Sequence, residues 1–161
     1  MSDFVLDDFL PYQLAVLAER TSRAFSALYR ERFGISIPEW RVVAHLSQAG
    51  TVSVREIHAR VAMDKSKVSR AAARLEAAGY ITKTADPKDK RLVALSLTEK
   101  GWAMVEEITP LARQFEAEFL ARLGPRADAF REALSLLLDE EGGEAGGEAS
   151  QGEAGARRTS R

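Results

Sequence analysis

The chain has 161 residues and a formal net charge of −1, so it is long enough for one domain with its own hydrophobic core. It contains no cysteine, which excludes disulfides, thiolate metal sites and cysteine-based redox sensing. No apolar run approaches the roughly 18–20 residues of a membrane span, and the acidic start lacks the basic region of a signal peptide, so we expect a cytoplasmic protein without a membrane partner.

The charges are unevenly distributed along the chain. Residues 51–100 hold eleven Lys and Arg against six Asp and Glu, so this segment is basic while the remainder of the chain is acidic. A basic segment between acidic ends suggests a surface that binds a polyanion on an otherwise nearly neutral protein.

Three helices are predicted in the first part of the chain. Apolar residues recur at spacings of three and four over residues 7–32, which predicts a long first helix. Pro38 suits the first turn of a second helix, which ends near Gly50. Ser53 is a typical N-cap and predicts a short third helix directly after it.

A fourth helix and a hairpin follow. Residues 65–78 form a helical pattern, with Asp64 as the N-cap and Gly79 at the end. Residues 80–84 and 91–97 have the composition of two short strands, joined by the charged turn ADPKDK. Three helices followed by a hairpin are typical of a winged helix-turn-helix, which we place at about residues 36–98.

Two more helices and a polar tail complete the chain. Thr98 suits the N-cap of a helix over 99–122, which Pro110 should bend, and a last helix ends near residue 139. The tail, 141–161, contains no apolar side chain larger than alanine, so we expect it to be disordered. The predicted fold class is mainly α with a small β-hairpin wing (α+β), in a domain over residues 1–140.

The fourth helix has two chemically different faces. Val68, Ala71, Ala72 and Leu75 share an apolar face, while the opposite face and its flanks carry hydroxyl groups and cations. These groups suit base edges in a DNA major groove, and amides at a helix start favour phosphate. We predict DNA contacts for Ser53, Lys65, Ser66, Lys67, Ser69, Arg70, Ala73 and Arg74. The alternative is an ordinary solvated basic face.

The hairpin carries a second group of basic residues, in addition to those of the fourth helix. The alternation of Val93, Leu95 and Leu97 predicts that its strands are anchored on the core. An arginine on a thin β-turn fits a DNA minor groove, and the carboxylate of Asp89 is placed to hold the guanidinium of Arg91 by a charge-assisted hydrogen bond. The predicted DNA contacts here are Lys88, Asp89, Lys90 and Arg91. The alternative is a solvated turn with mixed charges.

Apolar seams also lie outside this DNA-binding segment, on the helices within 7–32 and 99–139. One chain of this length cannot easily cover all of these seams, whereas two intertwined copies can. We therefore predict a homodimer with these as its dimerisation helices. Its two recognition helices would enter successive major grooves about 34–36 Å apart, on an imperfect palindrome of double-stranded DNA.

The stretch "VREIHARVAMDKSKVSRAAARLEAAGYITKTADPKDKRLVALSLTEKG" contains a D-x-R…LT…G pattern, formed by Asp89, Arg91, Leu97, Thr98 and Gly101. On these residues the chain resembles the multiple-antibiotic-resistance regulator (MarR) family, from residue 8 to about 139. The resemblance implies an obligate homodimer, Arg91 in the minor groove, helix 65–78 in the major groove and, as the usual mode, repression. "FGISIPEWRVVAHL" and "AMDKSKVSRA" resemble the branch that controls aromatic-acid degradation, in which some relatives respond to aromatic acids or their coenzyme A thioesters.

The implied effector site lies near Trp40, which can stack on an aromatic ligand or belong to the core. Arg41 and His45 share a helix face and can bind a carboxylate or remain a solvated pair, and Arg20 lies at the edge of the first helix's apolar stripe. The candidate effector-binding residues are Arg20, Trp40, Arg41 and His45.

The sequence argues against an enzyme. It has no glycine-rich phosphate loop, no metal-spaced His and Asp set and no nucleophile elbow, so we expect no cofactor, metal site or catalytic residue. A winged helix used for protein contacts or for structural dimerisation is the alternative function. Cations on both the fourth helix and the wing favour DNA instead.

Overall fold

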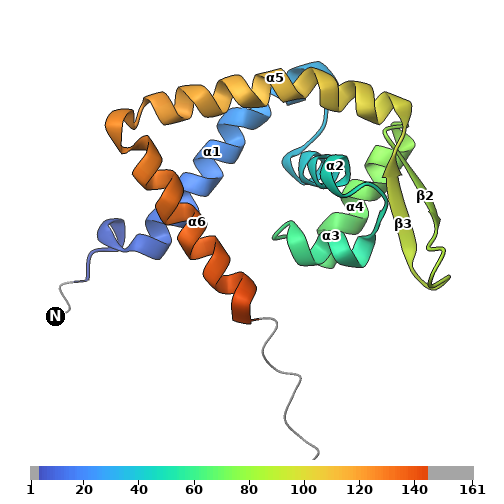
Figure 1. Cartoon of the computed structure of the whole chain (residues 1–161). Helices are drawn as coiled ribbons and strands as arrows, with labels where there is room; N and C mark the ends of the chain where they lie inside the picture. The colour runs from blue at the N-terminus through green and yellow to red at the C-terminus, as the bar shows by residue number, and fades with distance from the viewer. Residues whose placement is uncertain (1–3, 145–161) are drawn as a thin grey trace, which may run out of the picture. The chain divides into compact units, whose positions relative to one another are not determined.

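The computed structural model describes residues 4–144 of the chain (Figure 1). The chain divides into two compact units, with the boundary between Glu116 and Ala117. The first unit contains the sheet, the first four α-helices and most of α5, and it holds every candidate DNA-contacting and effector-binding residue.

The N-terminal part begins with a 3-10 turn, η1 (Leu6–Asp8), followed by α1 (Leu10–Phe33) and α2 (Ile37–Ala49). The predicted start of the first helix at residue 7 is therefore wrong by three residues. Pro11 gives the physical reason, because a proline lacks the backbone N–H and is tolerated only in the first turn of a helix.

The middle of the chain has the predicted order of helices and strands. Its elements are β1 (Val52–Ser53), α3 (Val54–Arg60), α4 (Lys65–Ala77), β2 (Ile81–Ala85) and β3 (Val93–Leu97). The strands form an antiparallel sheet in the order β1-β3-β2, with Val52 opposite Leu95. β1 was not predicted, because two residues carry no periodic signal and their strand conformation depends on pairing with β3.

The caps predicted for α3 and α4 are confirmed. The Ser53 hydroxyl accepts a hydrogen bond from the Glu56 amide, while the Glu56 carboxylate accepts one from the Ser53 amide, which completes a capping box. The Asp64 carboxylate accepts a hydrogen bond from the Lys67 amide at 2.8 Å. These caps fix where both helices of the helix-turn-helix begin.

The core of the first unit lies between the helices and the sheet. Its fully buried members include Val42, Val43, Leu46, Ile57, Val68, Ala72, Leu95 and Ile108. Val93 does not join them, because it is 43% exposed while Ala94 and Leu95 are buried. The predicted anchoring role of Val93 is therefore wrong. Val93 pairs with Ala85 at the tip-side end of the strand ladder, and the core ends before that point.

α5 (Glu99–Ala121) begins in close contact with the end of α4. Thr98 caps it as predicted, because its hydroxyl accepts a hydrogen bond from the Gly101 amide at 3.1 Å. The same hydroxyl donates to the Gly79 carbonyl at 2.6 Å, and Lys100 Nζ donates to the Ala78 carbonyl at 2.7 Å. We call this contact, formed by residues 78–80 and 98–101, the α4–α5 junction.

Gly101 explains why the junction is so close. A Cβ atom at this position would lie 2.2 Å from the Tyr80 carbonyl oxygen, which is a backbone atom with little freedom to move. Two residues of the LT…G pattern therefore have structural roles. Thr98 caps α5, and Gly101 leaves the space that two closely approaching backbones need.

The second unit contains the last turn of α5, the 3-10 turn η2 (Gly124–Arg126) and α6 (Ala127–Glu144). Phe119 and Phe130 form a ring pair with centroids 6.2 Å apart. α6 continues five residues beyond its predicted end at 139, because glycine lowers helix propensity by about 1 kcal/mol without forbidding the helix. The predicted tail overlaps α6 up to residue 144, and its remainder, 145–161, lies outside the described residues.

The fold class is confirmed as mainly helical with a small antiparallel sheet. Within residues 4–144, no helix combines the length and hydropathy needed to cross a membrane.

Candidate nucleic-acid interface and effector cavity

α4 presents a polar outer face. Val68, Ala71, Ala72 and Leu75 are at most 4% exposed, which confirms the predicted apolar face. The predicted contact residues Lys65, Ser66, Lys67, Ser69, Arg70, Ala73 and Arg74 are all exposed. Arg70 is in the middle of this face, where a side chain reaches the edges of bases if the helix enters a major groove.

The Asp64 carboxylate accepts hydrogen bonds at the first turn of α4. Asp64 Oδ1 accepts hydrogen bonds from the Ser66 hydroxyl at 2.6 Å and from the Lys67 amide at 2.8 Å. These bonds, the Ser66 bond first, hold the pKa of Asp64 below its usual range. The Lys67 amide at the start of α4 is therefore already used by Asp64, whereas the Lys67 side chain is exposed.

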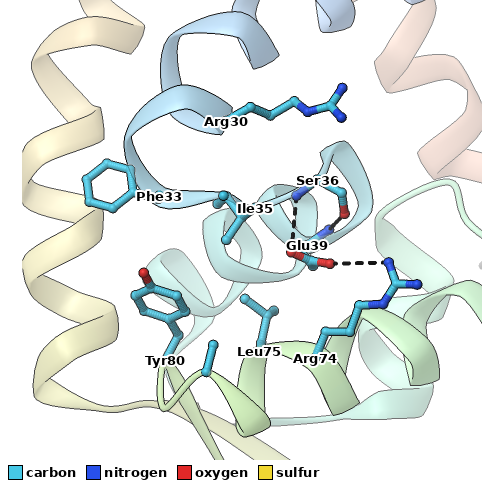
Figure 2. Close-up of a pocket in the computed structure, with 10 residues that line it drawn as sticks. Arg30, Phe33, Ile35, Ser36, Glu39, Arg74, Leu75 and Tyr80 are labelled. Carbon is cyan, nitrogen blue, oxygen red and sulfur yellow. Dashed lines mark hydrogen bonds and ion pairs between the residues drawn. The ribbon is translucent and has the colours of Figure 1, made fainter.

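Both flanks of α4 are connected to neighbouring elements by ion pairs. On one flank, Arg74 Nη1 lies 3.7 Å from Oε1 of Glu39 in α2 (Figure 2). On the other flank, Glu76 Oε2 lies 3.1 Å from Nζ of Lys83 in β2. The sequence showed neither pair, since each joins residues on different elements.

The wing tip is organised by two aspartates. Asp86 Oδ1 accepts hydrogen bonds from the Lys88 amide at 2.8 Å and the Asp89 amide at 3.1 Å, which closes the turn. Asp89 Oδ1 accepts from the Arg91 amide at 3.1 Å and from Arg91 Nε at 3.2 Å, so the predicted bond between these side chains is confirmed. The Arg91 side chain is 91% exposed, and its Nε is held by Asp89.

Two further predicted contacts, Lys88 and Lys90, are exposed on the wing beside Arg91.

The predicted contact at Ser53 is withdrawn. Ser53 is only 3% exposed, and its hydroxyl is used in the capping box of α3. Ser53 therefore acts as a helix cap and is not available to DNA.

A separate cavity of about 460 Å³ lies between α2 and α5. Its lining residues are Trp40, Ala44, Ser47, Gln48, Val105, Thr109, Ala112, Arg113 and Glu116. Of the predicted effector-binding residues, Trp40 lines this cavity, whereas Arg20, Arg41 and His45 do not. Arg41 and His45 each follow a lining residue by one position, and one position on an α-helix turns the side chain by about 100°.

Trp40 also belongs to an aromatic cluster. Its ring stacks on Tyr29 at 5.5 Å between centroids and meets Phe25 edge-on at 5.7 Å. Burial raises the pKa of Tyr29 to about 12. The side chain therefore packs on the core, as one interpretation predicted, and it also borders the cavity, while stacking on an aromatic ligand stays a prediction.

Arg113 is the cation of this cavity that sequence reasoning missed. The signal available was helical spacing, since Ala112 and Arg113 follow Thr109 on α5 by three and four residues. The described residues, 4–144, contain no group of three His, Asp or Glu side chains placed to hold a metal ion.

Comparison with known proteins gives a consistent family. A family model described as MarR family matches residues 33–92. The HTH-type transcriptional repressor MdtR of Bacillus subtilis is 33% identical over 93 residues, which are 58% of this chain and 60% of MdtR. The alignment thus spans less than two thirds of the length of that repressor.

Solved structures match over nearly their whole length. A MarR/EmrR family transcriptional regulator from Acinetobacter sp. ADP1 has a TM-score of 0.75 and 30% identity, covering 88% of this chain and 98% of that chain. BpsR of Bordetella bronchiseptica, whose DNA binding is regulated by 6-hydroxynicotinic acid, has a TM-score of 0.73 at 24% identity, with the same coverages, and shares the fold. MdtR is named as a repressor of transcription and the Acinetobacter protein as a transcriptional regulator, in agreement with the sequence prediction that this chain is not an enzyme.

Proposed function

The chain belongs to the MarR family, and we propose that it is a DNA-binding transcription regulator, acting as a homodimeric repressor released by a small effector. The observation that carries the proposal is that two exposed basic surfaces lie on the same compact unit. One is the outer face of α4 with Arg70 at its centre, and the other is the wing tip with Arg91 held by Asp89.

The two surfaces have different tasks in the proposed complex. Arg70 enters the major groove and bonds to base edges, so it provides sequence preference. Arg91 enters the minor groove, where groove width matters more than base identity. The exposed lysines Lys65, Lys67, Lys88 and Lys90 contact phosphates, which position the protein without reading sequence.

Dimerisation is proposed from exposed apolar side chains in each unit. On α1, Leu10, Leu14 and Leu17 are 61%, 50% and 41% exposed. On α6, Leu136, Leu137 and Leu138 are 57–65% exposed. Exposed leucines at this density are typical of a surface that a partner covers. We therefore assign residues 36–98 to DNA binding, the flanking helices to a homodimer, and a palindromic sequence to the operator.

The cavity between α2 and α5 is the proposed effector site. Its volume of about 460 Å³ suits a small molecule, Trp40 offers a ring for stacking, and the Arg113 guanidinium suits a carboxylate. The proposed ligand class is a small aromatic acid or its thioester. Such a ligand releases DNA only if it binds the two conformations of the dimer with different affinities.

A duplex titration tests the DNA-binding proposal. An operator is first selected from a random duplex pool, and then wild type, Arg70→Ala and Arg91→Ala are titrated against operator and scrambled duplexes at two salt concentrations. Arg70→Ala should cost about 1–3 kcal/mol on the operator and little on scrambled DNA, whereas Arg91→Ala should weaken binding to both. Arg20→Ala, which removes an equal charge from α1, is the control.

The outcomes separate the candidate functions. If Arg91→Ala binds both duplexes like wild type, the wing does not read DNA and this proposal fails. If wild type binds no duplex in a salt-dependent way, the winged helix serves protein contacts or structural dimerisation instead.

The effector proposal has its own measurement. In a Trp102→Phe background, benzoate should quench Trp40 fluorescence and weaken operator binding. Arg113→Gln should reduce benzoate affinity about ten-fold or more, because a hydrogen bond between charged groups contributes about 1.5–3 kcal/mol. Quenching that leaves operator affinity unchanged would argue against an inducer role for this cavity.

A further inference from the structure

Glu39 is a buried carboxylate that joins two helices. It is 6% exposed and occupies the third position of α2. Its Oε2 accepts a hydrogen bond from the Ser36 amide at 3.1 Å, and its Oε1 lies 3.7 Å from Arg74 Nη1 (Figure 2). One oxygen therefore stabilises the start of α2, while the other draws a cation of α4 toward α2.

Packing does not hold the Arg74 guanidinium in this place. Its side chain is 72% exposed, and cavities of about 380 and 290 Å³ are both lined by Ser36, Glu39 and Arg74. The guanidinium has open space around it, so the attraction to Glu39 is what favours this position. Without that attraction, a long arginine side chain samples many rotamers.

The position matters because Arg74 lies beside the proposed DNA-reading face. Lys67, Arg70 and Arg74 line the same cavity of about 290 Å³, so they share one flank of α4. A free guanidinium on this flank can reach phosphates of any sequence, and such contacts strengthen non-specific binding. A guanidinium paired with a carboxylate contributes less to the electrostatic attraction between the protein and DNA phosphates.

We propose that Glu39 is a specificity-determining residue that does not itself contact DNA. By holding Arg74 against the start of α2, it limits non-specific phosphate contacts by Arg74 and leaves sequence preference to Arg70. In the operator complex the restrained Arg74 is already in position for one phosphate. This inference depends on the DNA-binding function proposed above.

Glu39→Gln tests the proposal, because glutamine also serves in a capping box and keeps the size of the side chain. Binding to scrambled DNA should strengthen about two- to five-fold, the range for an exposed ion pair, and operator binding should strengthen less. The slope of log affinity against log salt on scrambled DNA should steepen by about 0.9, which corresponds to one more phosphate contact.

Two further variants separate the effect of Arg74 from the effect of charge alone. Glu76→Gln removes the same charge from the opposite flank of α4 and should change both affinities by the same factor. In an Arg74→Ala background, Glu39→Gln should lose most of its gain on scrambled DNA, because the restrained side chain is absent. The melting temperature of each variant controls for folding.

A measurement without DNA keeps the proposal testable if affinities are affected by stability. The ¹⁵N relaxation of Arg74 Nε should indicate a restrained side chain in wild type and a mobile one in Glu39→Gln. The proposal is overturned if Arg74 Nε is equally mobile in both proteins. It also fails if Glu39→Gln leaves the ratio of the two affinities unchanged, or gains as much in the Arg74→Ala background. If wild type binds no duplex at all, the proposed function fails together with it.

Discussion

Gly101→Ala adds a single methyl group at the α4–α5 junction, and the structure predicts a large loss of stability from it. The added Cβ would lie 2.2 Å from the Tyr80 carbonyl oxygen and 3.1 Å from Leu97 Cδ2. A contact of at least 3.0 Å requires the two backbones to separate by about 0.8 Å. Because the closest atom belongs to the backbone, no side-chain rotation can relieve the contact.

The separation acts on the hydrogen bonds of the α4–α5 junction. The Thr98 hydroxyl bond to the Gly79 carbonyl (2.6 Å) and the Thr98 amide bond to the Tyr80 carbonyl (3.0 Å) both lengthen. Overpacking costs about 1–3 kcal/mol and each weakened bond about 1 kcal/mol, while alanine regains at most about 1 kcal/mol of helix propensity. We expect a net loss of about 3 kcal/mol, or a melting temperature about 6–12 °C lower.

Urea unfolding followed by circular dichroism, at one fixed protein concentration, measures this loss. Gly34→Ala is the matched control, since Gly34 has a φ of +67° and no atom within 4 Å of an added Cβ. It should lose only the about 1 kcal/mol that a left-handed backbone costs an L-residue. If Gly101→Ala is as stable as Gly34→Ala or more stable, the close backbone approach is not a rigid feature and the reasoning is refuted.

Three further predictions concern stability and assembly. Ala62, in the turn between α3 and α4, has a φ of +51°, so Ala62→Gly should raise the unfolding free energy by about 0.5–1 kcal/mol; an unchanged urea midpoint would contradict this. The pKa of Tyr29 is raised from 10.0 to about 12, so the unfolded chain loses this proton first and stability should fall as pH rises from about 10 to 12. Tyr29→Phe should lack that decline, and equal pH profiles in urea would refute the assignment. Leu14→Asp and Leu137→Asp should each dissociate the proposed dimer in sedimentation without lowering secondary structure, because both leucines are exposed in the single chain. A dimer that persists in both variants would place the interface elsewhere.

The features that sequence predicted correctly depend on local chemistry. Ser53, Asp64 and Thr98 were recognisable as caps because each needs only the amide of a residue three positions later. The bond between Asp89 and Arg91 spans two residues in the same way. The inner face of α4 followed from helical spacing alone.

The features that sequence missed depend on neighbours distant in the chain. The contact between Glu39 and Arg74 forms only when α2 packs against α4, and no sequence pattern near either residue predicts the contact. Arg113 joins Trp40 at one cavity through the packing of α5 on α2. The alternation in β3 indicated two faces of a strand, but the exposure of Val93 depends on where the core ends.

The α4–α5 junction also has a mechanical consequence. Two carbonyls that follow α4 are bonded by side chains from the start of α5, and the next carbonyl oxygen has no space for a methyl group. Because this contact leaves no room for relative movement, α4 and the first turn of α5 should rotate together as one rigid body. A ligand that displaces α5 by a fraction of an ångström therefore does not need to reshape the helix-turn-helix. The ligand needs only to tilt the helix-turn-helix, and a small tilt at the junction produces a larger displacement at the end of α4 that is distant from α5.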